Sequence, residues 1–379
     1  MSKADTIILA REALLPALAL VNRAVERRST IPVLQNILLA VDASAGTMSL
    51  TGTDLDCELR TSVACQAGRD SLFTLPSGLL HDAVRKLPDG VDIALQADEA
   101  SATISAGRAR FKVPVLPAVD FPAMSEAAYS HSFEVEARHI KRMLDTVAFA
   151  ISTEETRYYL NGIHWHEDGG SLNAVATDGH RLAKFALPSP EGSAGMPPII
   201  IPRRTVALIG QVLEDGRKLT VRASETRLRI EAGDATLTTK LIDGKFPDYV
   251  RVIPTGNANH FTIEKEALAK AVDRVGTVSS GRGSAVKFAF AGVEGMLVLS
   301  TNNPDAGSAN DEVSIENAQG AAVEIGFNGK YCLDLLAAAE GKRLTFSLGD
   351  AGAPALIQRE DDGDLAVKPL FVLMPMRVS

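Results

Sequence analysis

Thr6-Ile-Ile-Leu-Ala-Arg-Glu-Ala-Leu14 begins a pattern that the chain of 379 residues repeats twice. The copies are Ser132-Phe-Glu-Val-Glu-Ala-Arg-His-Ile140 and His260-Phe-Thr-Ile-Glu-Lys-Glu-Ala-Leu268, at offsets of 126 and 128 residues. In each copy the apolar residues first alternate, which is the period of a β-strand, and then recur every three to four residues, which is the period of a helix. The pattern therefore predicts, three times over, a strand that leads directly into a helix.

A second strand-to-helix junction repeats independently of the first. It reads Leu75-Pro-Ser-Gly-Leu-Leu80, Ile201-Pro-Arg-Arg-Thr-Val206 and Phe327-Asn-Gly-Lys-Tyr-Cys332, with offsets of 126 and 126 residues. Two of these helices are predicted to end at Asp89-Gly90 and Asp215-Gly216, because glycine readily adopts the left-handed conformation of a helix C-cap. Short alternating runs broken by Gly, Asp and Asn separate the helices and predict antiparallel strands.

The two repeated junctions divide the chain into three units, each close to one third of 379 residues. Polar connectors marked by glycine and proline predict the boundaries, so that the domains span residues 1–129, 130–257 and 258–379. The predicted fold class is α+β, with three tandem repeats of a domain that contains two helices and antiparallel sheet.

The net charge of −8, from 39 basic and 47 acidic residues, argues at first against a polyanion such as DNA as a partner. The six predicted helices span residues 11–28, 77–90, 136–147, 202–218, 264–275 and 328–343. Together they carry +6, which leaves −14 on the rest of the chain. Basic helices shared by three repeats favour a surface that attracts phosphates without reading bases, although solvated cations are the alternative for any single helix.

The chain contains none of the common phosphate-loop, dinucleotide-binding, nucleophile-elbow or HExxH motifs. His164 and His166 would share one face of a strand, but no third metal ligand is evident beside them. Asp178 and His180 resemble a catalytic pair that lacks a nucleophile or a metal. We therefore expect no cofactor, no metal site, no catalytic residue and no enzymatic activity.

The three cysteines lack the spacing of a zinc site and are too few for a disulfide framework. The N-terminus does not resemble a signal peptide, and no apolar run is long enough to span a membrane. These features predict a cytoplasmic protein with no membrane partner.

Four motifs together resemble the beta subunit of bacterial DNA polymerase III, the beta sliding clamp. They are Arg157-Tyr-Tyr-Leu-Asn-Gly162, Ala176-Thr-Asp-Gly-His-Arg-Leu-Ala183, Lys240-Leu-Ile-Asp-Gly-Lys-Phe-Pro-Asp-Tyr249 and Met374-Pro-Met-Arg377, with Thr51-Gly-Thr-Asp54 and Gly107-Arg-Ala-Arg-Phe111 in agreement. Each motif alone is weak, but their order and spacing across the chain are specific. The threefold repeat, which was found without them, agrees with the resemblance.

The resemblance implies a ring-shaped, head-to-tail homodimer with helices lining a hole around double-stranded DNA. Such a ring is a processivity factor in DNA replication: it slides without sequence specificity and tethers its partners. Those partners are the replicative DNA polymerase catalytic subunit, the clamp loader, and other DNA polymerases and repair proteins. The implied dimer interface includes Phe111, Thr277 and Val278, and packing of Phe111 in the core is the alternative.

Arg28, in the loop after the first helix, resembles a DNA-contacting position of the family. Four more DNA contacts are predicted from charge alone: Lys141, Arg142, Arg203 and Arg204. Gly78 and Glu154 stand at or near places where the family can contact DNA, which predicts a weaker grip here.

The resemblance also implies a groove between the second and third domains that binds short peptides of the partners. The matching positions are Leu160, Thr177, Gly179, His180, Arg181, Leu182, Pro247, Arg251, Val252, Val372, Met374, Pro375, Met376 and Arg377. Apolar side chains and methionine would form an adaptable wall, and the arginines would contact partners at the rim. Two alternatives stay open: a hydrolase that uses Asp178 and His180, and a protein-binding scaffold with no role on DNA.

Overall fold

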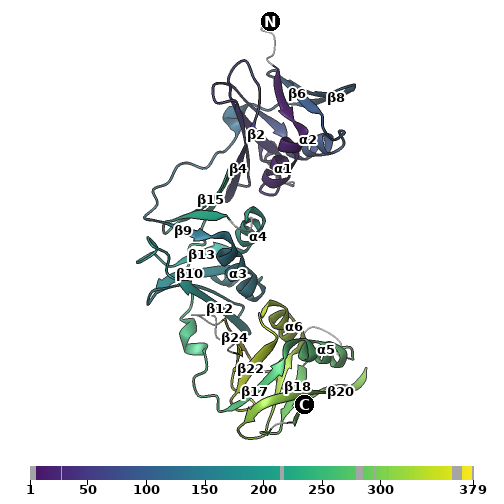
Figure 1. Ribbon diagram of the computed structural model, residues 1–379, viewed down its shortest axis with the longest axis vertical. Helices are drawn as coiled ribbons and strands as arrows, with labels where there is room; N and C mark the ends of the chain where they lie inside the picture. Colours follow the sequence, from purple (N-terminus) through teal and green to yellow (C-terminus); the bar gives the residue numbers. More distant parts are fainter. Residues whose placement is uncertain are drawn as a thin grey trace. The chain divides into compact units, whose positions relative to one another are not determined.

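The computed structural model describes residues 6–26, 28–213, 217–278, 285–293, 295–304, 306–360 and 369–377 (Figure 1). Its contacts divide the chain into two compact units. The first unit comprises Met1–Arg138 and Ala207–Leu241, and the second comprises His139–Val206 and Ile242–Ser379.

The first unit contains two antiparallel sheets. The four-stranded sheet has the order β1 (Ile7–Ala10), β6 (Asp92–Ala97), β7 (Ser101–Ala106) and β8 (Ala109–Pro114). The eight-stranded sheet has the order β5 (Ser71–Pro76), β2 (Asn36–Asp42), β3 (Thr47–Thr53), β4 (Cys57–Ala64), β16 (Ala235–Lys240), β15 (Arg227–Ala232), β14 (Lys218–Ala223) and β9 (His131–Glu136). Helices α1 (Arg11–Val21) and α2 (Ser77–Arg85) lie side by side and share one apolar core with both sheets (Figure 1).

The second unit is built on one sheet of twelve strands. Their order is β13 (Ile199–Pro202), β10 (Gly162–Asp168), β11 (Ser171–Thr177), β12 (Arg181–Pro188), β24 (Leu370–Leu373), β23 (Ala355–Arg359), β22 (Arg343–Leu348), β17 (Asn259–Glu264), β20 (Gly307–Gln319), β19 (Gly295–Asn303), β18 (Ala285–Phe290) and β21 (Val323–Asn328). Helices α5 (Lys265–Gly276) and α6 (Gly329–Ala338) pack on each other. Helices α3 (Ala137–Val147) and α4 (Arg203–Val212) each include residues of both units.

All six predicted strand-to-helix junctions are confirmed. In each case the helix begins at the residue after the strand: β1–α1, β5–α2, β9–α3, β13–α4, β17–α5 and β21–α6. Each repeat therefore has the same order of elements, a strand and a helix followed by four strands, a second helix and three strands. The α+β class and the threefold repeat are confirmed with it.

The predicted helix ends are wrong in several places. Helix α1 ends at Val21 instead of Arg28, and its C-cap residue Asn22 is buried, with its Oδ1 accepting a hydrogen bond of 2.7 Å from Ser77 Oγ. Helix α2 ends at Arg85 with Lys86 as its C-cap, so Gly90 lies beyond the helix although its φ is 75°. Asp215 and Gly216 lie outside the described residues.

The helices remain basic and the rest of the chain acidic when the observed, shorter helices are used. With the observed bounds, the six helices carry +5 and the rest of the chain carries −13 of the total of −8. Helices α3 and α4 contribute most of the excess, with +2 each. The basic character is therefore concentrated in the middle repeat.

Within the described residues, no helix combines the length and the apolar character needed to cross a bilayer.

Candidate functional site

The turn between β11 and β12 is fixed by its own polar side chains. The Asp178 Oδ1 atom accepts backbone N–H groups of His180 and Arg181 at 2.9 and 3.0 Å. Thr177 Oγ1 donates to the Arg181 carbonyl at 2.7 Å and accepts the Gly179 N–H at 3.1 Å. Gly179 has a φ of 88°, and a Cβ there would lie 2.6 Å from Arg157 Nη1. The Asp-Gly-His-Arg sequence thus forms a rigid hairpin turn whose carboxylate is engaged by the backbone.

Arg181 ties this turn to the third repeat. Its Nε donates to Asp178 Oδ2 at 3.0 Å, and its Nη1 donates to Asp334 Oδ2 on α6 at 2.7 Å. The guanidinium carbon lies 4.4 Å from the centre of the Tyr331 ring and 5.2 Å from that of Phe149. The side chain is only 11% exposed. Arg181 therefore binds two carboxylates of its own chain through Nε and Nη1, and its expected contact with partners at the rim stays a prediction.

The opposite face of the same strands is apolar. Leu182 pairs in register with Val372, and successive strand residues point to opposite faces, so Leu182 lies on the side away from Arg181. A buried cluster on this face contains Leu160, Val175, Leu182, Ile200, Phe246, Tyr249 and Val372. The structure therefore brings together three of the predicted groove residues, Leu160, Leu182 and Val372.

A short 3₁₀ helix, η5 (Tyr249–Val252), lies beside this cluster. Tyr249 is buried, whereas Val250 and Val252 are 61% and 47% exposed. Arg251 is exposed and pairs with Asp248 at 2.8 Å, and Pro247 is exposed as well. Val250 and Val252 therefore expose apolar side chains beside the buried cluster.

The C-terminal residues are held by backbone hydrogen bonds. The Met374 N–H donates to the His180 carbonyl at 2.9 Å, and the Met376 N–H donates to the Gly326 carbonyl at 2.7 Å. Met374 is 36% exposed, so its side chain is not enclosed in the core. Arg377 is exposed as predicted for a rim residue.

A cavity of about 1680 Å³ adjoins this segment. Of the predicted groove residues, it is lined by His180, Arg181, Met374, Pro375 and Met376. Sequence reasoning did not select Phe149, Tyr331 and Asp334, which also line it. Of the fourteen predicted positions, three therefore lie in the buried apolar cluster and five line this cavity.

Three family models cover nearly the whole chain, all of the DNA polymerase III beta subunit. The N-terminal domain matches residues 6–125, the central domain residues 134–248 and the C-terminal domain residues 250–377. The chain belongs to the DNA polymerase III beta subunit family. The resemblance inferred from the motifs is thereby confirmed.

Relatives and solved structures agree with this family. The chain is 44% identical to the beta sliding clamp of Caulobacter vibrioides, over 98% of this chain and 100% of the relative, and 34% identical to that of Escherichia coli K12, over 97% and 98%. A crystal structure of the Bartonella birtlesii DnaN sliding clamp bound to griselimycin superimposes with a TM-score of 0.92 at 42% identity, covering 98% of this chain and 99% of that one. The Caulobacter crescentus clamp, with PEG bound, gives 0.93 at 42% identity and covers 100% of both chains.

The basic positions selected for this clamp family member differ in their surroundings. Arg28, Arg203 and Arg204 are exposed, and exposed Lys141 forms an ion pair with Asp145 one helical turn away, at 2.6 Å. Arg142 is different, because both arms of its guanidinium bind the Glu340 carboxylate and its carbon lies 5.4 Å from the Phe185 ring centre. The structure thus gives Arg142 an internal partner instead of a surface free for phosphate.

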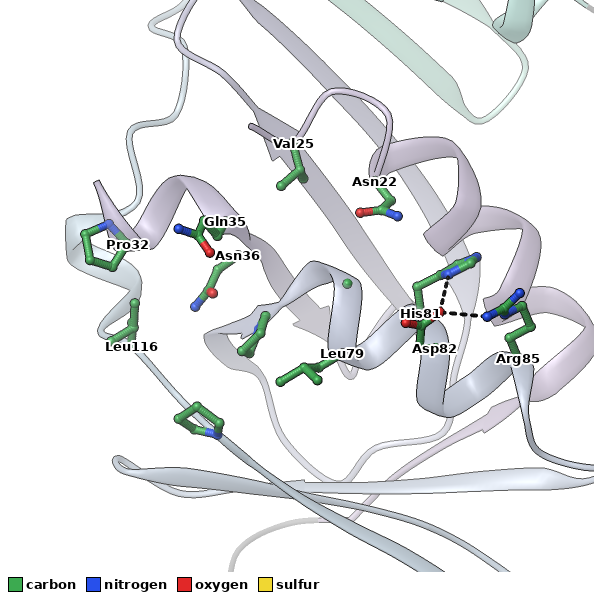
Figure 2. Close-up of a pocket in the computed structure, with 13 residues that line it drawn as sticks. Asn22, Val25, Pro32, Gln35, Asn36, Leu79, His81, Asp82, Arg85 and Leu116 are labelled. Atoms are coloured by element: carbon green, nitrogen blue, oxygen red, sulfur yellow. Dashed lines mark hydrogen bonds and ion pairs between the residues drawn. The ribbon is translucent and has the colours of Figure 1, made fainter. Parts of the chain in front are cut away.

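The structure also describes the surroundings of Glu154 and Gly78, the two positions that predicted weaker binding to DNA. Glu154 is engaged by Thr156 and Arg157, whose hydrogen bonds lower the pKa of its carboxyl group. Gly78, the second residue of α2, has no atom within 4 Å of the place where a Cβ would stand. It lines a cavity of about 690 Å³, which Figure 2 shows bordered by Asn22, Leu79 and Arg85. A long basic side chain at position 78 would have room, and glycine leaves that room empty.

The three interface positions can be described one unit at a time. Phe111 lies on β8, the last strand of the four-stranded sheet, and is half-buried against the core of the first unit. In the second unit, exposed Thr277 caps α5, with its Oγ1 3.3 Å from the Asp273 carbonyl. Val278 is half-buried, and its carbonyl accepts Asn303 Nδ2 at 3.1 Å.

Two histidines on β10 contact Phe246 and Tyr249. His164 and His166 share one face of β10, and their rings stack at 4.7 Å. His164 also stacks on Phe246 at 4.6 Å, with the rings 4° from parallel. Burial, followed by the neighbouring charge of His166, lowers the pKa of His164 to about 4, and burial and Lys184 lower that of His166. Among the described residues, no group of three potential ligands that could hold a metal includes them.

This burial predicts an acid-sensitive fold. The folded state binds a proton at His164 less readily than the unfolded chain. Neutral His164 therefore contributes fully to the free energy of unfolding above pH 6.5, and this contribution is lost as the pH falls towards 4. The His164→Phe variant keeps an aromatic ring in the stack but has no group to protonate. Between pH 6.5 and 4 its free energy of unfolding should fall by about 1–3 kcal/mol less than that of the wild type. Thermal unfolding at pH 7, 6, 5 and 4 measures the difference. Parallel loss of stability in the two proteins would contradict the assignment.

Proposed function

We propose that this chain is the processivity factor of a bacterial replicative DNA polymerase. Two copies form a ring that encircles duplex DNA, slides without sequence specificity and tethers its partners through the groove. It acts in the cytoplasm and is not an enzyme. Its three clamp domains are residues 1–129, 130–257 and 258–379.

The observation that carries this proposal is a repeated strand pairing. The fourth strand of the first repeat, β4, pairs with the last strand of the second, β16, and the fourth strand of the second repeat, β12, pairs with the last strand of the third, β24. The same rule assigns β20 of the third repeat to β8 of a first repeat. In the described residues, β8 pairs only with β7, and the first half of β20 pairs only with β19.

Pairing β20 of one copy with β8 of another satisfies both edges. A head-to-tail contact of this kind is heterologous, and it closes when two copies supply six repeats. Open strand edges are otherwise sites of uncontrolled association. Phe111 on β8 would then lie in the interface, and Thr277 and Val278 at the end of α5 would border it.

The ring accounts for the charge distribution. Helices with a net charge of +5 attract the DNA backbone, and a remainder of −13 repels it elsewhere. Because the ring cannot leave a closed DNA, weak phosphate contacts suffice. We propose Arg28, Lys141, Arg203 and Arg204 as contacts, and we assign Arg142 to the junction with Glu340.

The groove is the proposed site for partner peptides: those of the replicative polymerase catalytic subunit, the clamp loader, and other polymerases and repair proteins. Its apolar floor of Leu160, Leu182 and Val372 and its adaptable methionines fit several apolar peptides. The Bartonella birtlesii relative binds griselimycin, and we propose that this chain binds it in the groove.

The oligomeric state tests the strand-pairing rule. At micromolar concentration, sedimentation equilibrium should give a mass near twice 40.2 kDa. Phe111→Ala should shift the equilibrium towards the monomer while leaving each folded chain with a cooperative unfolding transition. A wild-type protein that remains monomeric at these concentrations would contradict the ring.

Variants of the neighbouring residues Lys141 and Arg142 on α3 distinguish a DNA contact from a residue that stabilises the fold. Arg142→Ala removes the two-point partner of the half-buried Glu340 carboxylate, leaves it only Arg359 Nη1 at 3.9 Å, and should cost about 1–2 kcal/mol of stability. Lys141→Ala removes an exposed ion pair with Asp145 and should cost less than about 0.5 kcal/mol.

For DNA binding, in contrast to stability, Lys141→Ala should have a larger effect than Arg142→Ala. Lys141→Ala and Arg28→Ala should each lower the slope of log affinity against log salt by about 0.9 at most, which is the value of one phosphate contact. Arg142→Ala should leave that slope unchanged. A reduced slope for Arg142→Ala with unchanged stability would reverse both assignments.

The groove is tested by truncating the chain after Leu373. Loss of Met374–Arg377 should abolish binding of griselimycin and of a labelled polymerase peptide, because these residues line one half of the groove, while the dimer persists. His180→Ala is the companion variant, since a hydrolase built on Asp178 and His180 would lose turnover in it. Unchanged affinity after truncation would refute the groove, and a hydrolytic activity that depends on His180 would favour the rival function.

A further inference from the structure

The wall of the groove is joined to the sheet beneath it by a side-chain hydrogen bond. Tyr249, the first residue of η5, places its hydroxyl 3.1 Å from His166 Nε2 on β10. Among the described residues, this is the side-chain hydrogen bond that connects Phe246–Val252 to the twelve-stranded sheet. The other polar contact of this segment, Arg251 with Asp248, is internal to it.

An aromatic platform surrounds this hydrogen bond. The rings of His164 and His166 stack at 4.7 Å, Phe246 covers His164 at 4.6 Å, and Tyr249 meets His166 edge-on at 5.7 Å. Phe246 and Tyr249 are only 7% and 8% exposed. The two buried aromatic residues of this segment, Phe246 and Tyr249, therefore pack on His164 and His166 and anchor the wall.

The anchors and the groove floor belong to one packed cluster. Phe246 and Tyr249 pack with Leu160, Leu182 and Val372. The residues that follow Tyr249 turn outwards, so Val250 and Val252 are exposed. A shift of Tyr249 would consequently move both the wall and its contact with the floor.

We infer that His166 is a positioning residue for peptide binding: by holding the Tyr249 hydroxyl, it fixes η5 as the wall of the groove. This inference rests on the proposed function, because it assigns a role within the same groove. His166 does not contact the peptide itself. Its effect reaches the ligand through Tyr249 and the exposed valines.

The physical reason is the cost of a buried phenol without a partner. Tyr249 is buried, its hydroxyl is bonded to His166, and Lys184 Nζ lies over the face of its ring instead, 5.7 Å from the ring centre. If the imidazole is removed, the hydroxyl regains a partner only by moving towards water, and η5 moves with it. A purely structural histidine would instead lower stability without changing the groove.

The test compares isosteric variants by calorimetric titration with griselimycin and with a labelled polymerase peptide. Tyr249→Phe and His166→Phe should each weaken both ligands about fivefold, the effect expected from one hydrogen bond. The double variant should be no weaker than either single variant, because both remove the same interaction. His166→Gln retains an amide that can bond the hydroxyl and should recover most of the affinity.

Tyr129→Phe serves as the matched control. Tyr129 also hydrogen-bonds through its hydroxyl, to the Thr238 side chain, but it belongs to the first unit. Its removal should leave the affinity for both ligands unchanged. Thermal unfolding of every variant confirms that the titrated protein is folded.

The outcomes separate the inference from the function on which it rests. Wild-type protein that binds neither ligand would overturn the proposed function and the inference together. Wild-type binding with unchanged affinity in Tyr249→Phe and His166→Phe, even at lowered melting temperature, would overturn the inference alone. Additive losses in the double variant would also overturn it, since the two residues would then act separately.

Discussion

Antiparallel pairing between the fourth strand of one repeat and the last strand of the next is the interaction on which the rest of this structure depends. It occurs twice within the chain, as β4 with β16 and as β12 with β24. Each pairing extends a sheet from one repeat into its neighbour, so the repeats share backbone hydrogen bonds as well as side-chain contacts. By the same rule, β20 of one copy would pair with β8 of another copy. The proposed ring follows from this pairing between copies.

The same pairing positions residues of the proposed partner-binding groove. The β12–β24 ladder sets Leu182 opposite Val372 on one face and directs Arg181 to the other, where it reaches Asp334 on α6. The groove is thus a consequence of a junction that the fold already requires. The ion pair between Arg142 and Glu340 reinforces that junction from α3. A net charge of −8 is compatible with DNA only because this repeated architecture separates basic helices from acidic strands and loops.

The features that the sequence predicts well are local and periodic. A change from alternating to helical spacing predicts each strand-to-helix junction, and all six occur in the structure. Helix lengths are predicted less well: α1 ends before Asn22, whose buried side chain binds Ser77, 55 positions away. The internal ion pairs of Arg142 and Arg181 could not be predicted from local spacing, since their carboxylate partners lie 198 and 153 positions away. Tyr249 belonged to a quoted motif, yet nothing in its spacing points to His166.

The central claim is that the protein is held on DNA by topology. It is tested most directly by loading the protein onto nicked circular DNA with its clamp loader and then cutting the circle once. The ring account predicts stable retention on the circle at moderate salt and rapid loss after the cut. Retention on the linear DNA equal to that on the circle would contradict it, because only a protein that grips the duplex surface would stay.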